Sequence, residues 1–249
     1  MEENMYTGFA SVYDVFMDSI PYDEWTSYLC KILKEYRIEQ GTLLELGCGT
    51  GTISNLMADR GFQIIGVDIS QEMLEMAYAK KENRSILYVN QDMRNLELNG
   101  KVDAIYSLCD SMNYLLEYEE LVETFCRVRA FLEEDGIFIF DAKTWSFYEE
   151  IGDSVIAENR EIGSFIWEND FCDDDGINEY CLTLYVKKNQ DNYQRFEEVH
   201  RQRAYPIAVW KEALEEAGFE CLHIYRAFTN QDASEEDDRV YFVAKSKVD

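Results

Sequence analysis

The stretch Leu44-Glu45-Leu46-Gly47-Cys48-Gly49-Thr50-Gly51 is the part of the sequence that says most about the fold. Apolar residues typical of a short buried strand lead into closely spaced glycines, and residues 53–60 then show the apolar spacing of a helix. A glycine-rich turn between a strand and a helix lets a ligand approach main-chain N–H groups. A dinucleotide-binding turn would need glycine in place of Thr52, and Glu45 would repel a pyrophosphate. The turn therefore favours a cofactor that carries no phosphate.

Two further carboxylates follow the next two predicted strands. Asp68 comes directly after the strand 62–67, where a carboxylate can accept both hydroxyls of a ribose. Asp92 follows the strand 86–89 and can accept a hydrogen bond from an adenine amino group, with Met93 against the ring. Together with the glycine turn, these residues favour S-adenosylmethionine (SAM), whose cationic ammonium is compatible with an acidic residue beside the turn.

Segment 41–142 alternates between predicted strands and helices. Its strands are short and almost continuously apolar, which is typical of a parallel sheet covered by helices on both faces. The predicted strands are 42–46, 62–67, 86–89, 102–108 and 137–140; the predicted helices are 53–60, 71–81 (with Ser70 as the N-cap) and 121–132, and residues 133–136 are expected to form a turn.

The flanking segments have other patterns. Helices are expected at 6–17 and 21–37, at 206–217, and strands at 219–228 and 239–245. Between them, residues 153–205 alternate with period two and predict an antiparallel β insertion of three or four strands. We therefore expect a SAM-binding domain formed by 1–152 and 206–249, in which 1–39 form a helical lid, and an insertion at 153–205 that caps the active site.

Four motifs resemble those of class I SAM-dependent methyltransferases: E-L-G-C-G-T-G at 45–51, V-D-I-S at 67–70, N-Q-D-M at 90–93 and L-C-D-S-M-N-Y-L at 108–115. The resemblance implies an α/β, Rossmann-like seven-stranded sheet whose last strand is antiparallel, and SAM as cofactor with S-adenosylhomocysteine as product. The residues it implies for cofactor binding are Tyr13, Glu45, Gly47, Cys48, Gly49, Gly51, Asp68, Ile69, Met73, Asp92, Met93, Leu108 and Cys109.

The N-terminal stretch 6–14, the stretch 198–205 and the β insertion are similar to those of small-molecule N-methyltransferases, including amino-sugar enzymes, and of uncharacterised bacterial methyltransferases. In the amino-sugar enzymes a tyrosine that matches Tyr6 lies at the transfer site, and a histidine stands where this chain has Tyr114. The chain thus shares the layout of these enzymes and departs from them at one site residue.

Methyl transfer from a sulfonium needs an aligned nucleophile, exclusion of water and, for a protonated nucleophile, a base. The residues expected to serve catalysis are Tyr6, Asp110, Tyr114 and His200, and those expected to contact the substrate are Asn113, Trp167, Arg203 and Tyr205. On the last insertion strand, His200 and Gln202 share one face while Arg203 and Tyr205 share the other. Because a slip of one residue reverses the faces, the pattern does not decide which face lines the pocket.

The composition narrows the possible partners. A formal net charge of −27 without a basic cluster disfavours nucleic acids and anionic membranes. Seven scattered cysteines without a C-x-x-C pair argue against disulfides and structural zinc, and only two histidines are present, so no metal is expected. The N-terminus does not resemble a signal peptide, and we expect a cytoplasmic protein that is a monomer or a homodimer.

Three functions remain open. The leading interpretation is transfer of a methyl group to a nitrogen or oxygen atom of a small molecule. A second is methylation of a protein or an RNA, although residues 108–111 lack the proline-rich tetrapeptide of the amino-methylating DNA and protein-glutamine enzymes. A third is a SAM-binding protein without turnover.

Overall fold

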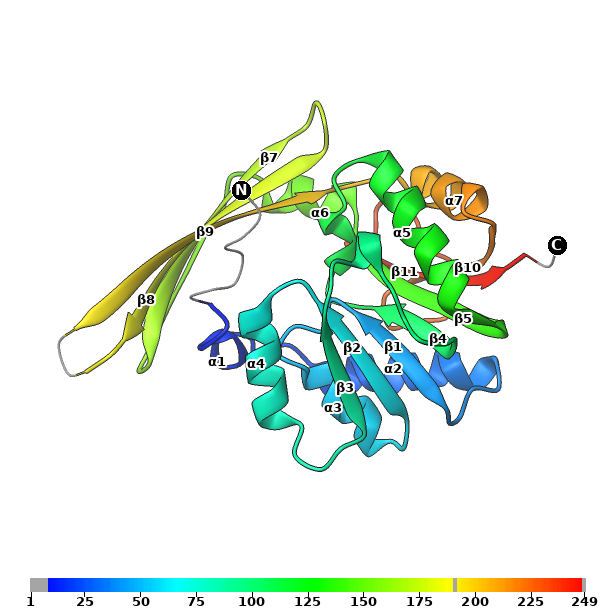
Figure 1. The fold of residues 1–249 in the computed structure, drawn as a ribbon. Coiled ribbons are helices and arrows are strands. Elements are labelled where there is room, and N and C mark those ends of the chain that lie inside the picture. Colours follow the sequence, from blue (N-terminus) through cyan, green and yellow to red (C-terminus); the bar gives the residue numbers. More distant parts are fainter. Residues whose placement is uncertain (1–8, 190–191, 248–249) are drawn as a thin grey trace.

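The computed structural model describes residues 9–189 and 192–247, and it contains two sheets (Figure 1). The larger sheet has seven strands in the order β10-β11-β5-β4-β1-β2-β3, and β11 runs antiparallel to both of its neighbours. Its strands are β1 (Thr42–Leu46), β2 (Gln63–Asp68), β3 (Ile86–Asn90), β4 (Val102–Ser107), β5 (Leu132–Lys143), β10 (Phe219–Arg226) and β11 (Arg239–Ser246). The predicted Rossmann-like sheet with an antiparallel last strand is therefore confirmed.

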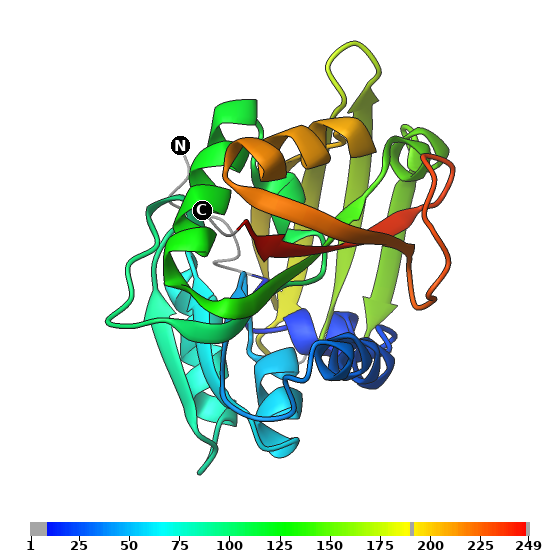
Figure 2. The same ribbon diagram turned by 90° about the vertical axis from the view of Figure 1, so that its right-hand side faces the viewer.

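Helices cover both faces of this sheet because successive residues of each strand point to opposite sides (Figures 1 and 2). Residues of α5 (Tyr118–Phe131) and α7 (Ile207–Glu216) share one hydrophobic core with one side of the sheet. Residues of α2 (Tyr22–Glu35), α3 (Thr52–Asp59) and α4 (Gln71–Lys80) share a second core with the other side. In β4, for example, Ile105 belongs to the first core and Tyr106 to the second.

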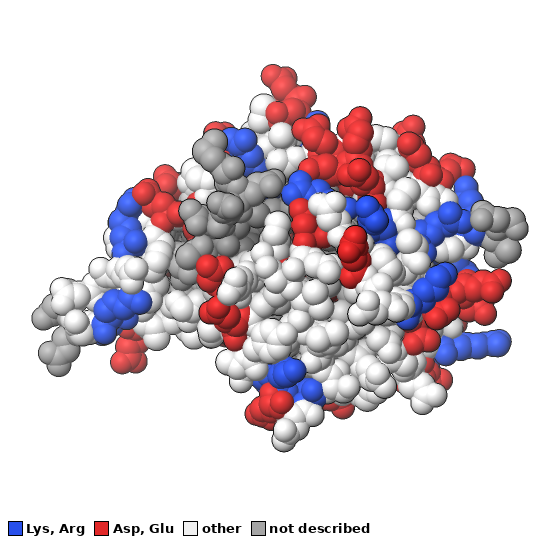
Figure 3. Space-filling model, in the orientation of Figure 1, with Lys and Arg blue, Asp and Glu red and all other residues white. Residues whose placement is uncertain are grey.

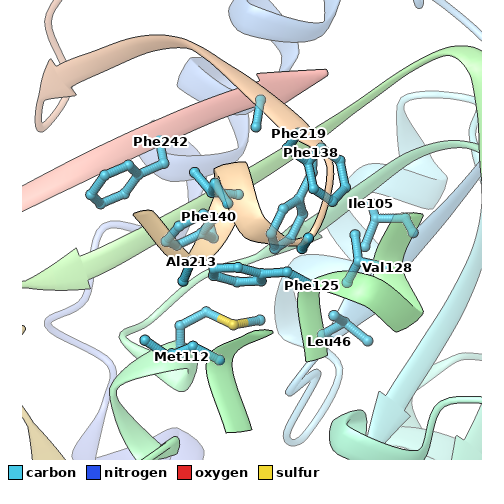
Figure 4. Close-up of a cluster of buried hydrophobic side chains, with 14 of the residues drawn as sticks. Leu46, Ile105, Met112, Phe125, Val128, Phe138, Phe140, Ala213, Phe219 and Phe242 are labelled. Atoms are coloured by element: carbon cyan, nitrogen blue, oxygen red, sulfur yellow. The ribbon is translucent and has the colours of Figure 1, made fainter. Parts of the chain in front are cut away.

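Aromatic rings fill the first core between β5, β11, α5 and α7 (Figure 4). Phe140 stacks on Phe242 of the neighbouring strand, with ring centroids 4.6 Å apart, and lies 5.4 Å from the rings of both Phe125 and Trp210. All four side chains are buried. This packing fixes β5 and β11 side by side, and so it also fixes the residues at their ends.

The smaller sheet is formed by the predicted insertion. Its order is β6-β7-β8-β9, all antiparallel, with β6 (Val155–Arg160), β7 (Gly163–Cys172), β8 (Ile177–Lys187) and β9 (Tyr193–Arg203). The insertion is joined to the larger sheet by α6 (Trp145–Ile151) before it and by α7 after it. It extends away from the larger sheet on the side of the N-terminal residues 13–16 (Figure 1).

The inner face of the small sheet has an apolar half and a polar half. In the apolar half, Phe165 and Leu184 lie opposite each other and pack against Phe9 and Phe16 of the N-terminal segment. In the polar half, Tyr180 lies opposite His200. Residues 198, 200 and 202 of β9 belong to the polar half and carry no aliphatic side chain, whereas the apolar half is formed mainly by β7 and β8.

Two local predictions were wrong. Within the described residues, the helix expected at 6–17 is a single turn, α1 (Tyr13–Phe16). The chain before it forms a turn instead, in which Val12 N–H donates to Phe9 O, three residues back rather than the four of an α-helix. The turn expected at 133–136 belongs to β5, which begins at Leu132 and contains an irregularity opposite β4. The glycine and acidic residues at 133–136 thus form a β-bulge at the beginning of a strand, and the chain does not reverse there.

We expect replacement of Phe140 by alanine to destabilise the fold by about 3–5 kcal/mol, because it removes a fully buried ring from a packed aromatic cluster. Urea unfolding would measure the change. The matched control is Leu87→Ala on the exposed side of β3, which should cost well under about 1 kcal/mol. Equal effects of the two substitutions would contradict the packing described here.

Candidate active site

The glycine loop connects β1 to α3 at the carboxyl edge of the larger sheet. Gly47, Gly49 and Gly51 have φ angles of +72°, +52° and +75°, which favour glycine. A Cβ atom at Gly47 would lie 2.5 Å from Ser111 Oγ, and one at Gly51 would lie 2.2 Å from the Tyr88 hydroxyl. At Gly49 a Cβ atom would meet nothing within 4 Å. The loop is therefore packed from behind at both ends and open at its centre, where a ligand can reach the backbone.

Asp68 organises the loop from the end of β2. Its carboxylate accepts hydrogen bonds from Gly49 N–H at 2.7 Å and from Ser70 N–H at 2.8 Å. Burial raises the pKa of Asp68, and these two N–H groups oppose that rise. Beside it, the large apolar side chain of Ile69 is 44% exposed. The Asp68 carboxylate, which can accept hydrogen bonds from hydroxyl groups, thus lies next to the exposed apolar side chain of Ile69. A nucleoside presents a matching pair of groups, the hydroxyls of its sugar and the flat face of its base.

Glu45 lies beneath the loop. Its carboxyl group accepts hydrogen bonds from Ser54 Oγ and from the Tyr106 hydroxyl, the latter at 3.2 Å. Burial raises the pKa of Glu45 to about 8. Glu45, which in the sequence favoured a cationic ligand at the loop, therefore connects β1, α3 and β4 below the backbone of the loop.

Asp92 follows β3, as predicted, and is paired with a neighbour. Its carboxylate accepts from the Arg94 backbone N–H at 2.9 Å and forms an ion pair with the Arg94 guanidinium at 2.6 Å. The same arginine also forms an ion pair with Glu120 of α5. Met93 begins the short helix η1 (Met93–Asn95) and is partly buried, while Met73 is buried in α4 next to the Ser70 N-cap. Contact of these residues with a cofactor stays a prediction.

The chain is strained directly after β4. Leu108 is buried, and the next two residues, Cys109 and Asp110, have φ angles of +61° and +54° although neither is glycine. Such left-handed residues cost on the order of 1 kcal/mol or more each and persist where their surroundings hold them. Burial raises the pKa of the Cys109 thiol, so this side chain carries little thiolate.

Asp110 is held from four directions. Its N–H donates to Asp141 Oδ1 at 2.9 Å, and its carboxylate accepts from Arg239 at 2.7 Å and from Gln202 at 2.8 Å. Lys143 Nζ lies 3.3 Å from the same carboxylate. Burial alone would raise the pKa of Asp110, but the two cations outweigh it and lower the pKa. Asp110 therefore joins the ends of β4, β5, β9 and β11.

Aromatic side chains surround the ammonium of Lys143. It lies 4.4 Å from the ring centroid of Phe147 and 5.8 and 5.7 Å from those of Tyr148 and Tyr180. The Tyr148 hydroxyl donates to Gln202 Oε1 at 2.8 Å, so α6 is tied to β9 at this point. Burial lowers the pKa of Lys143. The polar half of the small sheet is thereby docked onto the carboxyl edge of the large one.

His200 lies between two polar side chains. Its Nδ1 is 3.5 Å from the hydroxyl of Tyr114, which ends the short helix η2 (Ser111–Tyr114), and its Nε2 is 3.1 Å from Glu198 Oε2. His200 and Glu198 are buried. The face of β9 that carries residues 198, 200 and 202 is thus the one that meets the strand ends of the large sheet.

The N-terminal segment contacts both sides of this region. Asp14 accepts from Thr50 Oγ1 of the glycine loop at 2.6 Å and forms an ion pair with Lys80 at 2.6 Å. Phe9 N–H donates to Glu198 Oε1 at 3.2 Å. Tyr13 lies within the segment, and burial raises the pKa of its hydroxyl. The predicted catalytic residue Tyr6 lies outside the described residues.

The residues predicted to contact the substrate lie around this region and make contacts within the protein. Asn113 exchanges hydrogen bonds with the backbone of Lys143 and donates to Arg203 O at 2.9 Å. Tyr205 is buried and donates to Leu115 O, while Arg203 donates to Leu116 O at 2.5 Å. Trp167 packs edge-on against Tyr180 on the inner face of the small sheet. Substrate contact by these residues stays a prediction.

Sequence reasoning missed the side chains that connect the strand ends. Lys143 and Arg239 are direct partners across the β5–β11 ladder, which only the register of that pair reveals. Glu198 was detectable, because it shares the period-two face of His200 and Gln202.

Charged side chains of both signs lie on the surface of the protein. Figure 3 shows acidic and basic side chains intermixed on one face, with acidic ones grouped along its top edge. Within residues 9–189 and 192–247, no group of three or more His, Cys, Asp or Glu side chains is placed to hold a metal ion. Among the helices of that same part of the chain, none has the length and apolar character needed to cross a bilayer.

Replacement of Glu45 by glutamine should stabilise the protein increasingly as the pH rises. The folded-state pKa of about 8 lies above the ordinary value of 4.5, so the charged form is disfavoured by folding. The contribution of Glu45 to stability is complete below pH 4.5 and is lost as the pH rises to about 8. The difference between E45Q and wild type in urea unfolding should grow across this range, by up to about 5 kcal/mol. A difference independent of pH would contradict the burial of this carboxyl group.

Known proteins resemble this chain over its whole length. Residues 43–136 match the family described as "Methyltransferase domain". The chain is 37% identical to "Putative methyltransferase YqeM" of Bacillus subtilis over 248 residues, which is 98% of each protein. A solved S-adenosylmethionine-dependent methyltransferase from Clostridium acetobutylicum superposes with a TM-score of 0.86 and 26% identity, over 98% of this chain and all of that one.

A more distant relative carries a substrate in its name. The chain is 27% identical over 150 residues to the dTDP-3-amino-3,4,6-trideoxy-alpha-D-glucopyranose N,N-dimethyltransferase of Streptomyces venezuelae, which covers 59% of this chain and 62% of that enzyme. The glycine loop, the carboxylate at the end of β2, the seven-stranded sheet and the full-length similarity agree, and the chain belongs to the class I SAM-dependent methyltransferases.

Proposed function

We propose that this enzyme transfers a methyl group from SAM to a nitrogen or oxygen atom of a small molecule. The observation that carries the proposal is the enclosure of the carboxyl edge of the sheet. The N-terminal segment contacts the glycine loop through Asp14 and the small sheet through Phe9, and β9 is tied to the strand ends through Gln202. An edge covered in this way leaves room for a small acceptor rather than for a folded macromolecule.

The cofactor residues follow from the geometry of the loop. Gly49 would let the cofactor approach the backbone, Asp68 would accept the ribose hydroxyls, and Ile69 would lie against the adenine. When bound, the cofactor supplies an electrophilic methyl group on a positively charged sulfur. The protein has to orient the acceptor, exclude water and receive a proton where the acceptor carries one.

Nitrogen is the acceptor atom that the relatives favour. The Streptomyces venezuelae relative is named as an N,N-dimethyltransferase of an amino sugar nucleotide. A net charge of −27 also favours a cationic acceptor over an anionic one. We place Tyr114, His200 and Asp110 around the acceptor, with the small sheet as its cover.

Cofactor binding should depend on Asp68. Isothermal titration calorimetry with S-adenosylhomocysteine should show binding to the wild type, and Asp68→Ala should weaken it by about 10–100-fold, because two hydrogen bonds to a carboxylate are lost. Asp59→Ala is the matched control, since Asp59 ends α3 and its carboxylate pairs with Arg84 on the surface. Absence of binding to the folded wild type would refute the assignment of the cofactor site.

Incubation of the enzyme with a cell extract and methyl-labelled SAM should place the label in the small-molecule fraction. The signal should disappear with Asp68→Ala and persist with Asp59→Ala. Label in protein or RNA would instead favour the macromolecular alternative. Binding of the cofactor without label in any fraction would favour a protein without turnover.

A further inference from the structure

Glu198 is a buried carboxylate whose two oxygens face different parts of the site. Oε2 lies 3.1 Å from His200 Nε2, and Oε1 accepts the Phe9 N–H at 3.2 Å. The side chain lies on the inner face of β9, opposite Leu182 and close to the apolar half of the small sheet. Because a buried carboxylate needs donors, each oxygen constrains the group that faces it.

The first constraint acts on the imidazole of His200. A carboxylate only accepts hydrogen bonds, so the neutral ring must carry its proton on Nε2. Nδ1 then presents a lone pair toward the hydroxyl of Tyr114, 3.5 Å away. In this arrangement the carboxylate binds one ring nitrogen and orients the ring, and the other ring nitrogen is left to act as the base.

The second constraint acts on the N-terminal segment. Phe9 N–H reaches Glu198 only when the segment lies on the small sheet, where Phe9 and Phe16 pack against the apolar half. The same segment bonds Thr50 of the glycine loop through Asp14. One short stretch of chain therefore contacts the loop of the cofactor site and the carboxylate behind His200.

We propose that Glu198 is a positioning residue, which holds His200 as the base for the acceptor and ties that orientation to docking of the N-terminal segment. This inference rests on the proposed function. As the new bond from the acceptor atom to the methyl carbon forms, the electron pair of the sulfur–carbon bond passes to sulfur. The acceptor's proton passes through the Tyr114 hydroxyl to His200 Nδ1, and the carboxylate of Glu198 balances the resulting imidazolium.

Asp110 is a weaker candidate for this base. Its carboxylate already accepts from Arg239 and Gln202 and is paired with Lys143, and its pKa is lowered. A carboxylate stabilised in its charged form has little tendency to take a proton. The described groups that face His200 are Glu198 on its own strand, Tyr180 on β8 and Tyr114 on η2, with Asp110 and Lys143 behind them.

The tautomer can be read directly by NMR. The chain has two histidines, so a long-range proton–nitrogen spectrum of the side chains at mildly alkaline pH resolves His200, with His223 as an internal reference. We expect the wild-type spectrum to show a protonated Nε2 and an unprotonated Nδ1 on His200. In Glu198→Gln, the side-chain amide can donate as well as accept a hydrogen bond. The imidazole of His200 should then no longer prefer the tautomer that carries its proton on Nε2.

Glu197→Gln is the matched control, because Glu197 is the adjacent exposed residue and pairs with Arg195 on the outer face of β9. Its spectrum should equal that of the wild type. A wild-type His200 that carries its proton on Nδ1, or a tautomer unchanged in E198Q, would overturn the proposal. The wild-type spectrum decides even if E198Q does not fold.

Turnover provides the second readout. With the acceptor found in the extract, E198Q should lower kcat by about 10–100-fold, which is part of what a general base contributes, while KM for SAM changes by less than about twofold. Glu198→Asp should recover part of kcat. Unchanged kcat in E198Q would overturn the role of Glu198. Absence of S-adenosylhomocysteine binding to the wild type would instead refute the proposed function and leave the tautomer result in place.

Discussion

The arrangement of the site depends on the way in which Asp110 is held. Two consecutive residues with left-handed backbone angles, Cys109 and Asp110, leave β4 in a conformation that costs free energy. The cost is offset by bonds from three other strands, through Asp141 on β5, Arg239 on β11 and Gln202 on β9. Removal of Arg239 would leave the buried carboxyl group of Asp141 without its ion pair. The strained backbone at Cys109 and Asp110 therefore depends on the charged side chains that hold Asp110.

This cluster also explains how the two sheets are joined. Gln202 belongs to the small sheet, and Asp110 to the edge of the large one. The contact fixes which face of β9 points inward and so brings His200 against Tyr114. On the other half of the same face, apolar side chains receive the N-terminal segment. The inner face of one small sheet thus serves both the site, through β9, and the N-terminal segment, through β7 and β8.

The sequence predicted the frame well because its signals are local. A strand, a glycine turn and a helix follow one another from Thr42 to Asp59, and Ser70 caps α4 as its position predicts. The antiparallel β11 came from the resemblance to a known family. The carboxylates that follow successive strands were expected at one edge of the sheet, because the carboxyl ends of parallel strands lie at the same edge.

The rest depended on contacts between distant parts of the chain. Whether residue 200 or 203 faces inward depends on one residue of register, which contacts with distant parts of the chain decide, such as those of Gln202 with Asp110 and Tyr148. Pairing of Asp92 with Arg94 and Glu120 likewise needs the position of α5. The helix expected at 6–17 was wrong within the described residues, because that segment is ordered by the small sheet rather than by its own periodicity.

The assignment of the site can be tested by a crystal structure of the enzyme with S-adenosylhomocysteine. We expect the adenine against Ile69, the ribose hydroxyls on the carboxylate of Asp68, and the sulfur facing the region between Tyr114 and His200. Ligand bound away from the glycine loop, or a sulfur directed away from His200, would contradict it.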